Sequence, residues 1–220
     1  MKEDVTIHES DALLVIDMQY DFLPGGALAV AGGDTIVSGI NRLIAGFHDN
    51  ILPVVFTQDW HPPNHASFAS QHEGKQPHDP VDDPSGRIGP ILWPDHCVQG
   101  TKGAEIHQAM ALDKATAILR KGFRPSIDSY SAFLENDKRT PTGLQGMLKE
   151  LKVQRVFTCG LALDYCVYNT AIDAIDAGFD VIYVIDLAKP VGAPEGIVER
   201  VLDEMCQKEV VFTRLDHVVV

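Results

Sequence analysis

Six short apolar runs constrain the fold most strongly. They are four to six residues long, contain many β-branched residues, and cover residues 12–16, 51–56, 115–119, 153–158, 181–185 and 209–212. Such runs suit strands buried on both faces of a sheet. Between them, apolar residues recur at helical spacing over 36–47, 167–175 and 197–205. This alternation predicts an α/β three-layer sandwich, with a central, mostly parallel six-stranded sheet and helices on both faces.

Length and charge narrow the class of protein further. The chain has 220 residues, 45 % of them hydrophobic, and a formal net charge of −13. We therefore expect a single domain over 1–220 that does not bind nucleic acid, because phosphate contacts need clustered Lys and Arg. No apolar run is long enough to span a membrane, and residues 1–11 lack the apolar core of a signal peptide. We expect no membrane association, a cytoplasmic location, and four cysteines without disulfides.

The segment 58–102 departs from this regular alternation. It contains seven of the 13 prolines and five of the nine histidines. Long irregular loops are uncommon and usually functional. This one begins at the carboxyl end of a predicted strand, where open α/β sheets bind their ligands. We expect it to form part of the wall of a site.

Three reactive side chains lie after predicted strands. Asp17 could act as a general base, or cap the next turn. Lys121 could pair with Asp17 and tune a nucleophile, or be a solvated loop lysine. Cys166 lies where a Gly-containing turn leads into a helix, whose N-terminus would lower the thiol pKa. The alternative is an unreactive buried cysteine.

The irregular segment also contains a candidate metal-binding set. Asp59, His61 and His96 together offer one carboxylate and two imidazoles, which suits a divalent ion. His65 is a further candidate ligand. The spacing is equally compatible with a histidine-rich surface loop. The chain has no GxGxxG, GxxxxGK[ST] or HExxH motif, which argues against a dinucleotide-dependent dehydrogenase.

Five stretches together resemble the nicotinamidases of the isochorismatase-like cysteine hydrolase superfamily. They occur in the family's order and are IDMQYDFLPGGALAV at 16–30, TQDWHPPNHASFA at 57–69, WPDHCVQGT at 93–101, RKGFRPSIDSYSAF at 120–133 and CGLALDYCVYNTA at 159–171. The resemblance implies hydrolysis of nicotinamide to nicotinate and ammonia. Pyrazinamide also has a carboxamide beside a ring nitrogen, so this mechanism predicts that it is hydrolysed too. It assigns Asp17, Lys121 and Cys166 as the catalytic triad.

The resemblance implies the rest of the site as well. The backbone N–H groups of Ala162 and Cys166 would form the oxyanion hole, beside a cis peptide bond at Leu161–Ala162. Asp59, His61 and His96 would bind one divalent metal ion, most readily zinc, with iron or manganese compatible. The implied pocket residues are Phe22, Trp93, Tyr130 and Leu161.

Other functions remain open at this point. A sister cysteine hydrolase acting on an N-carbamoyl or ureido amide would share the triad but generally lack the metal set. An isochorismatase proper would lack the cysteine. A non-catalytic binding module would be expected to have lost a triad residue, and this chain retains all three. A homo-oligomer is compatible with the fold.

Overall fold

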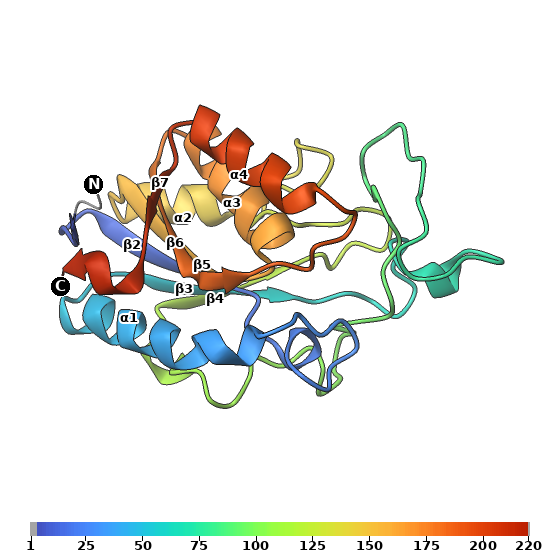
Figure 1. The fold of residues 1–220 in the computed structure, drawn as a ribbon, viewed down its shortest axis with the longest axis horizontal. Helices are drawn as coiled ribbons and strands as arrows, with labels where there is room; N and C mark the ends of the chain where they lie inside the picture. The colour runs from blue at the N-terminus through green and yellow to red at the C-terminus, as the bar shows by residue number, and fades with distance from the viewer. Residues whose placement is uncertain (1–3, 220) are drawn as a thin grey trace.

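The computed structural model describes residues 4–219, so the ends of the predicted 1–220 domain, residues 1–3 and 220, lie outside the described residues. A six-stranded sheet forms the middle layer (Figure 1). Its strands are β2 (Asp11–Ile16), β3 (Val54–Asp59), β4 (Ala117–Lys121), β5 (Arg155–Leu161), β6 (Asp180–Lys189) and β7 (Val211–Thr213). All of its pairings are parallel. The predicted three-layer α/β architecture is confirmed.

Helices cover both faces of this sheet. In Figure 1, α1 (Val37–Asp49) lies below it, and α2 (Leu144–Glu150), α3 (Tyr168–Asp176) and α4 (Ile197–Gln207) lie above it. The sequence patterns predicted α1, α3 and α4. They did not predict α2, a seven-residue helix that buries only two side chains, Leu144 and Leu148. The short β1 (Val5–Thr6) and β8 (Val218–Val219), which pair with each other, were also not predicted.

The apolar strands separate two hydrophobic cores. Along β2, Leu13 and Val15 pack into the core that contains the buried face of α1. Leu14 and Ile16 pack into the opposite core, which contains the buried residues of the other three helices. All six residues of β2 are buried. This is why its sequence from Ala12 to Ile16 is continuously apolar instead of alternating.

The order of strands in the sheet determines where a site can form. From edge to edge the order is β4-β3-β2-β5-β6-β7, so the chain runs outward from β2 to one edge and then from β5 to the other. Ligands of such sheets bind beyond the carboxyl ends of the strands, where this direction changes. Here the two central strands approach very closely. A Cβ atom on Gly160 would lie 2.1 Å from the carbonyl oxygen of Ile16.

The irregular segment 58–102 extends beyond these strand ends (Figure 1, teal to green). Its first two residues belong to β3, and the structure places one short 3-10 turn in it, Ala69–Gln71. It therefore lies beside the carboxyl edge of the sheet, as predicted.

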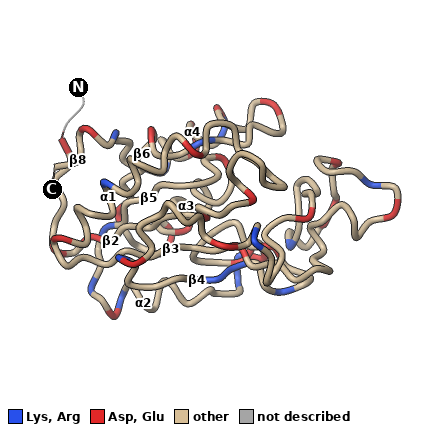
Figure 2. Tube along the Cα trace, turned by 90° about the horizontal axis from the view of Figure 1, so that it is seen from below, with Lys and Arg blue, Asp and Glu red and all other residues tan. Residues whose placement is uncertain are grey.

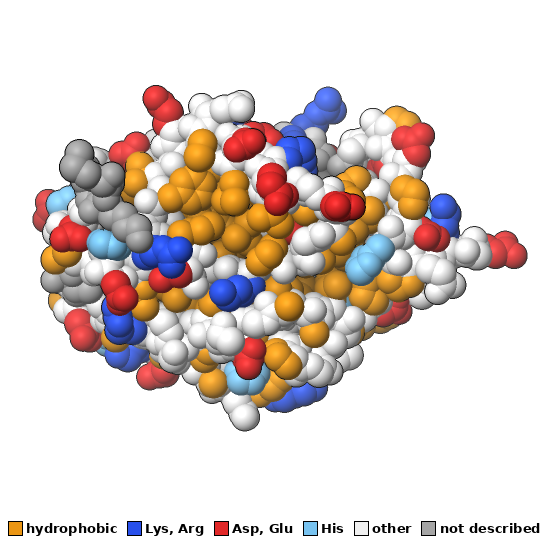
Figure 3. Space-filling view, in the orientation of Figure 1, with side chains coloured by type: hydrophobic (Ala, Val, Ile, Leu, Met, Phe, Trp, Pro, Cys, Tyr) orange, Lys and Arg blue, Asp and Glu red, His pale blue; other side chains and the backbone are white. Residues whose placement is uncertain are grey.

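The surface has two features of note. Figure 2 shows Lys and Arg dispersed among Asp and Glu along the described chain, with no continuous basic stripe. On the face of the molecule shown in Figure 3, which includes the sheet edge at β7, hydrophobic side chains gather in the band between α4 and α1. On this edge strand Val211 is 48 % exposed. Across residues 4–219, no helix has the length and apolar character needed to cross a membrane.

Candidate active site

The carboxyl ends of four adjacent strands bring together the polar residues singled out in the sequence. Asp17 directly follows β2, with a positive φ of 46°. Asp59 and Lys121 are the last residues of β3 and β4, each strand ending later than its apolar run indicated. Cys166 follows β5. Asp17, Asp59 and Cys166 each offer an atom within 4.8 Å of the others.

Lys121 is the centre of this cluster. Its fully buried Nζ lies 2.8 Å from Asp17 Oδ2 and 2.5 Å from Asp59 Oδ1. It also donates to the carbonyl oxygen of Ser129 at 2.8 Å and lies 3.4 Å from Cys166 Sγ. Burial by itself would lower the pKa of Lys121, but the two carboxylates outweigh it and raise that pKa well above its usual value. The amine is therefore a permanent cation between two anions and a thiol.

Asp17 has the properties of a base at neutral pH. Burial raises its pKa to about 6, although Lys121 acts in the opposite direction. Thr57 holds the carboxylate in place, because its hydroxyl donates to Asp17 Oδ1 at 2.6 Å. The other carboxylate oxygen, Oδ2, lies 2.8 Å from Lys121 Nζ. This oxygen retains a lone pair for a proton.

Cys166 differs from the sequence expectation. It lies in a π-helical turn, Leu163–Val167, and α3 begins only after this turn. Burial raises the pKa of the thiol well above its usual value, although Lys121 opposes this effect. The expectation of a pKa lowered by a helix N-terminus is therefore wrong, since desolvation of the thiolate dominates. The thiol is protonated in the free protein and needs a base to activate it.

The two residues expected to form the oxyanion hole lie directly after β5, at Ala162, and within this turn, at Cys166. The peptide bond Leu161–Ala162 is cis, as the resemblance implies. Ala162 and Cys166 both line the same pocket. Leu161 does not line it, because its side chain is completely buried in the core on the α1 side of the sheet. Leu161 is thus the predicted pocket residue that does not line the pocket, although Phe22, which belongs to the same core, does.

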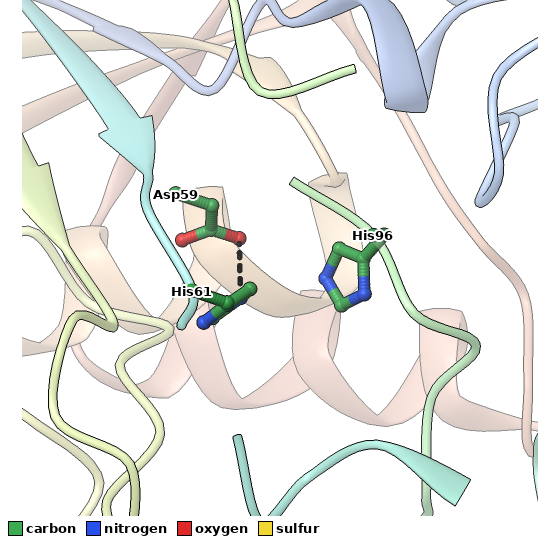
Figure 4. A group of neighbouring side chains, drawn as sticks. All are labelled: Asp59, His61 and His96. Atoms are coloured by element: carbon green, nitrogen blue, oxygen red, sulfur yellow. Dashed lines mark ion pairs between the residues drawn. The ribbon is translucent and has the colours of Figure 1, made fainter. Parts of the chain in front are cut away.

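Asp59, His61 and His96 face one another next to the cluster (Figure 4), and their candidate ligand atoms lie within 4.8 Å of each other. His61 Nδ1 lies 2.8 Å from the Gly122 carbonyl oxygen, and His96 Nδ1 lies 2.8 Å from the Pro94 carbonyl oxygen. Each Nδ1 must donate to its carbonyl, so in the neutral imidazoles both Nε2 atoms keep a lone pair. Asp59 Oδ2 lies 3.6 Å from His61 Nε2 and raises the pKa of His61. A carboxylate and two such imidazoles can hold a divalent metal ion.

Gly122 is required for this arrangement. Its φ is +64°, and a Cβ atom there would lie 2.5 Å from His61 Cε1. The glycine thus allows the chain leaving β4 to pass directly behind the imidazole and to present its carbonyl to Nδ1.

His65 is not brought into this set. Its ring lies 4.4 Å from the ring of His61, but it groups with His61 and Asp128 instead. Its Nδ1 contacts Ser67 Oγ at 2.7 Å, and its Nε2 lies 3.3 Å from the Ile127 carbonyl oxygen. Both ring nitrogens therefore already have partners.

A small pocket opens onto the cluster and onto the metal-binding set. Phe22, Trp93 and Tyr130 line it as predicted. The Trp93 indole donates to the Tyr130 hydroxyl at 3.0 Å, which fixes the two rings nearly at right angles. Sequence reasoning missed four further lining residues: Leu28, Asp128, Tyr165 and Val191. The first three lie inside the family-like stretches, which could have pointed to them, whereas Val191 lies outside all five.

This arrangement is suited to one class of reaction. A protonated thiol, a base with a free oxygen and a fixed cation are the components of nucleophilic attack on a carbonyl or amide carbon. The aromatic walls can hold a flat ring, and the adjacent metal-binding set can hold an ion.

Comparison with known proteins agrees with this geometry. The model of the isochorismatase domain family matches residues 11–215. A nicotinamidase of Acinetobacter baylyi is 50 % identical over 194 residues, covering 88 % of this chain and 87 % of its own.

Solved structures are also similar. A nicotinamidase and pyrazinamidase of Acinetobacter baumanii has a TM-score of 0.90 at 44 % identity, covering 95 % of this chain and 98 % of its own. The PnC1 protein of L. infantum, in complex with nicotinate, has a TM-score of 0.83 at 38 % identity, with 98 % of both chains covered. A pyrazinamidase of Pyrococcus horikoshii, in complex with zinc, has a TM-score of 0.74 at 36 % identity, covering 93 % of this chain and 99 % of its own.

Proposed function

The chain belongs to the isochorismatase family, and from this premise we propose that it is a metal-containing cysteine amidohydrolase that converts nicotinamide to nicotinate and ammonia. The observation that carries the proposal is the position of Lys121, which contacts Asp17, Asp59 and Cys166 at once. Lys121 thus connects the nucleophile Cys166 and the base Asp17 to the metal-binding set, and these groups lie beside one pocket with aromatic walls. The reaction would return nicotinamide to NAD synthesis.

The first half of the reaction forms a thioester. Asp17 Oδ2 takes the proton from Cys166 as Sγ attacks the carboxamide carbon. Lys121 compensates the charge that moves between them. The backbone N–H groups of Ala162 and Cys166 stabilise the oxyanion. The C–N bond then breaks, and Asp17 gives its proton to the departing nitrogen, which leaves as ammonia.

The second half restores the protein. Asp17 takes a proton from a water molecule, and the oxygen of that water attacks the thioester carbon. The C–S bond breaks and Asp17 returns the proton to Cys166 Sγ. The product leaves as nicotinic acid, which loses the second water proton to solvent and becomes nicotinate. One water molecule is consumed, and the side chains end as they began.

Asp59, His61 and His96 hold the metal ion in this proposal, and the ion is zinc. A bound ion would supply a Lewis acid able to bind the ring nitrogen of the substrate, and this would help to orient the ring. The residues around it have separate tasks. Gly122 and Pro94 orient the imidazoles, and Lys121 compensates the charge of Asp59.

The decisive experiment compares ammonia release from nicotinamide by the wild type and by Cys166→Ala, with the metal content of both recorded. Release by the wild type alone supports a cysteine-dependent nicotinamidase. If folded, metal-loaded wild type released no ammonia, the proposal would fail, and N-carbamoyl and ureido amides would be the next substrates to assay.

Pyrazinamide provides a test of the proposed substrate geometry. Like nicotinamide it carries a carboxamide on a ring that contains nitrogen, so the same orientation and attack apply. We expect ammonia release from pyrazinamide by metal-loaded protein. A preparation active on nicotinamide but with no detectable turnover of pyrazinamide would contradict it.

The association state forms a separate part of the proposal. The exposed edge at β7, where Val211 is 48 % exposed, is a surface at which a second copy of the chain could pack to form a homo-oligomer. Sedimentation velocity of the wild type and of Val211→Lys tests this, because a charge at such an interface should favour the monomer.

A further inference from the structure

Asp164 is a buried carboxylate that the reaction above does not use. It lies two residues before Cys166 in the π-helical turn and is 1 % exposed. Its Oδ1 accepts the N–H of Val191 at 2.9 Å, and its Oδ2 accepts the N–H of Gly192 at 2.7 Å. Both donors belong to residues 190–196, the loop that connects β6 to α4. Hydrogen bonds to an ionised acceptor are stronger than neutral ones.

Neighbouring residues reinforce this connection. The Tyr165 hydroxyl donates to the carbonyl oxygen of Ala193 in the same loop. On the other side, the Tyr183 hydroxyl of β6 donates to the Leu163 carbonyl oxygen at 3.0 Å. The turn that carries the nucleophile is therefore bonded to the sheet through Leu163 and to the loop through Asp164 and Tyr165.

The loop contributes one wall of the pocket. Val191 lines it together with Tyr165 and Cys166. The outer part of the loop, residues 194–196, is exposed. The position of Val191 relative to Cys166 is thus set by the hydrogen bonds from the nucleophile turn.

We propose that Asp164 is a positioning residue that closes the pocket at Val191 by holding the loop against the nucleophile turn, and so determines how tightly and how selectively the ring is bound. The inference rests on the proposed function, since it names a determinant of substrate binding at the same site. Asp164 has no contact with the reacting atoms in this account. Its loss should weaken substrate binding and change chemistry little.

The test uses full-length, metal-loaded protein with Asp164→Ala, Asp164→Asn and a matched control, Asp173→Asn. Asp173 is another buried carboxylate of the following helix, but it pairs with Lys138 and has no contact with the loop. Three quantities are measured: kcat and KM for nicotinamide, the same for the bulkier quinoline-3-carboxamide, and the rate at which N-ethylmaleimide modifies Cys166. Exposed Cys206 is the internal reference for modification.

For Asp164→Ala we expect KM for nicotinamide to rise about tenfold while kcat stays within about threefold, since binding energy is lost more than chemistry. Discrimination against the bulkier amide should fall, and Cys166 should react about tenfold faster relative to Cys206. Asp164→Asn retains one acceptor oxygen and should be intermediate. Asp173→Asn should behave as the wild type.

The proposal is overturned if folded Asp164→Ala keeps the wild-type KM and the wild-type rate of Cys166 modification, whatever happens to kcat. If Asp164→Ala does not fold, Asp164→Asn and Tyr165→Phe decide by the same criteria, since each removes only part of the connection. The modification rate can be measured without turnover. If the wild type failed to hydrolyse nicotinamide, the proposed function would be refuted, and the modification rate would still test the contact between Asp164 and the loop.

Discussion

The chemistry at the scale of single residues depends on charge balance in a dry site. Lys121 and Asp17 are completely buried, and Asp59 is 4 % exposed. An uncompensated charge in such a place is expensive, so each ion depends on the others. The single amine neutralises one of the two carboxylates, which leaves one net negative charge that would attract a divalent ion. Replacing Lys121 by Met should therefore disrupt both the nucleophile and the metal-binding set.

The nucleophile can be tested by removing only its sulfur. Cys166→Ala should abolish turnover while leaving the melting temperature within a few degrees of the wild type, because a small buried side chain replaces another. Ammonia release and thermal melting measure the two effects. The control is Cys206→Ala, which alters an exposed cysteine on α4. Wild-type turnover by the Cys166 variant would refute the covalent mechanism.

The pKa of Asp17 sets a pH limit on activity. Burial raises that pKa to about 6, and the free protein needs this carboxylate unprotonated to accept the thiol proton. As the pH falls through about 6 the base becomes protonated, so kcat/KM should decrease about tenfold for each further pH unit. Measuring kcat/KM from pH 4.5 to 8 tests this fall in activity on the acid side.

Asp17→Asn should be inactive across this range, because an amide does not accept the proton. An acid limb of the wild type centred near pH 4, the ordinary value for a carboxyl group, would contradict the assignment.

At the scale of elements, the strands supply the side chains, and the short connections after them set their directions. The turn after β4 is the clearest case, because it passes behind His61 with a glycine at positive φ. The π-helical turn after β5 does the same for Cys166. A small change in either connection would move a functional atom without altering the sheet.

Gly122→Ala tests the first connection. The added methyl group would lie 2.5 Å from the His61 ring, and positive φ costs a non-glycine residue about 1–2 kcal/mol. We expect loss of metal affinity and a lower free energy of unfolding. Metal titration and denaturant unfolding measure these.

The matched control for that variant is Gly146→Ala, inside α2, where a Cβ atom meets nothing within 4 Å. It should stabilise the protein by about 0.5–1 kcal/mol, since alanine is the better helix former. Equal metal affinity in both variants would refute the role given to Gly122.

For the whole molecule, the parallel topology brings residues far apart in sequence to one edge. Asp17, Lys121 and Cys166 come from strands whose order along the chain differs from their order in the sheet. The metal-binding set adds His61 and His96 from the long segment beyond that edge. An ion held there would link β3 to this segment and should stabilise the folded state as a whole.

Metal removal measures that stabilisation. Chelator-treated protein should melt at a lower temperature, and zinc at about 100 times its dissociation constant should restore about 2.7 kcal/mol of stability. His61→Ala should show lower metal content and little response to zinc. His48→Ala, a change at an exposed position on α1, should respond as the wild type. A melting temperature unaffected by chelation in metal-loaded wild type would contradict this linkage.

Much of the architecture follows from local sequence. The β-branched apolar runs and the helical spacing of Ile40, Leu43 and Phe47 were enough to predict the layers, because burial on one or two faces imposes its own period. The boundaries were less well predicted. The strands β3 and β4 end at Asp59 and Lys121, beyond the ends of the apolar runs that predicted them. They extend this far because the two strands continue to pair through these polar residues.

The sequence by itself determined which chemical groups stand at the ends of the strands, and its motifs indicated the family. Only the tertiary structure decided their state and their neighbours. It keeps the Cys166 thiol protonated, directs Leu161 into the core, gives His65 other partners, and brings Asp164 to the loop after β6. Desolvation, side-chain direction and hydrogen bonds between distant segments exist only once the chain is packed, so no local pattern of residues encodes them.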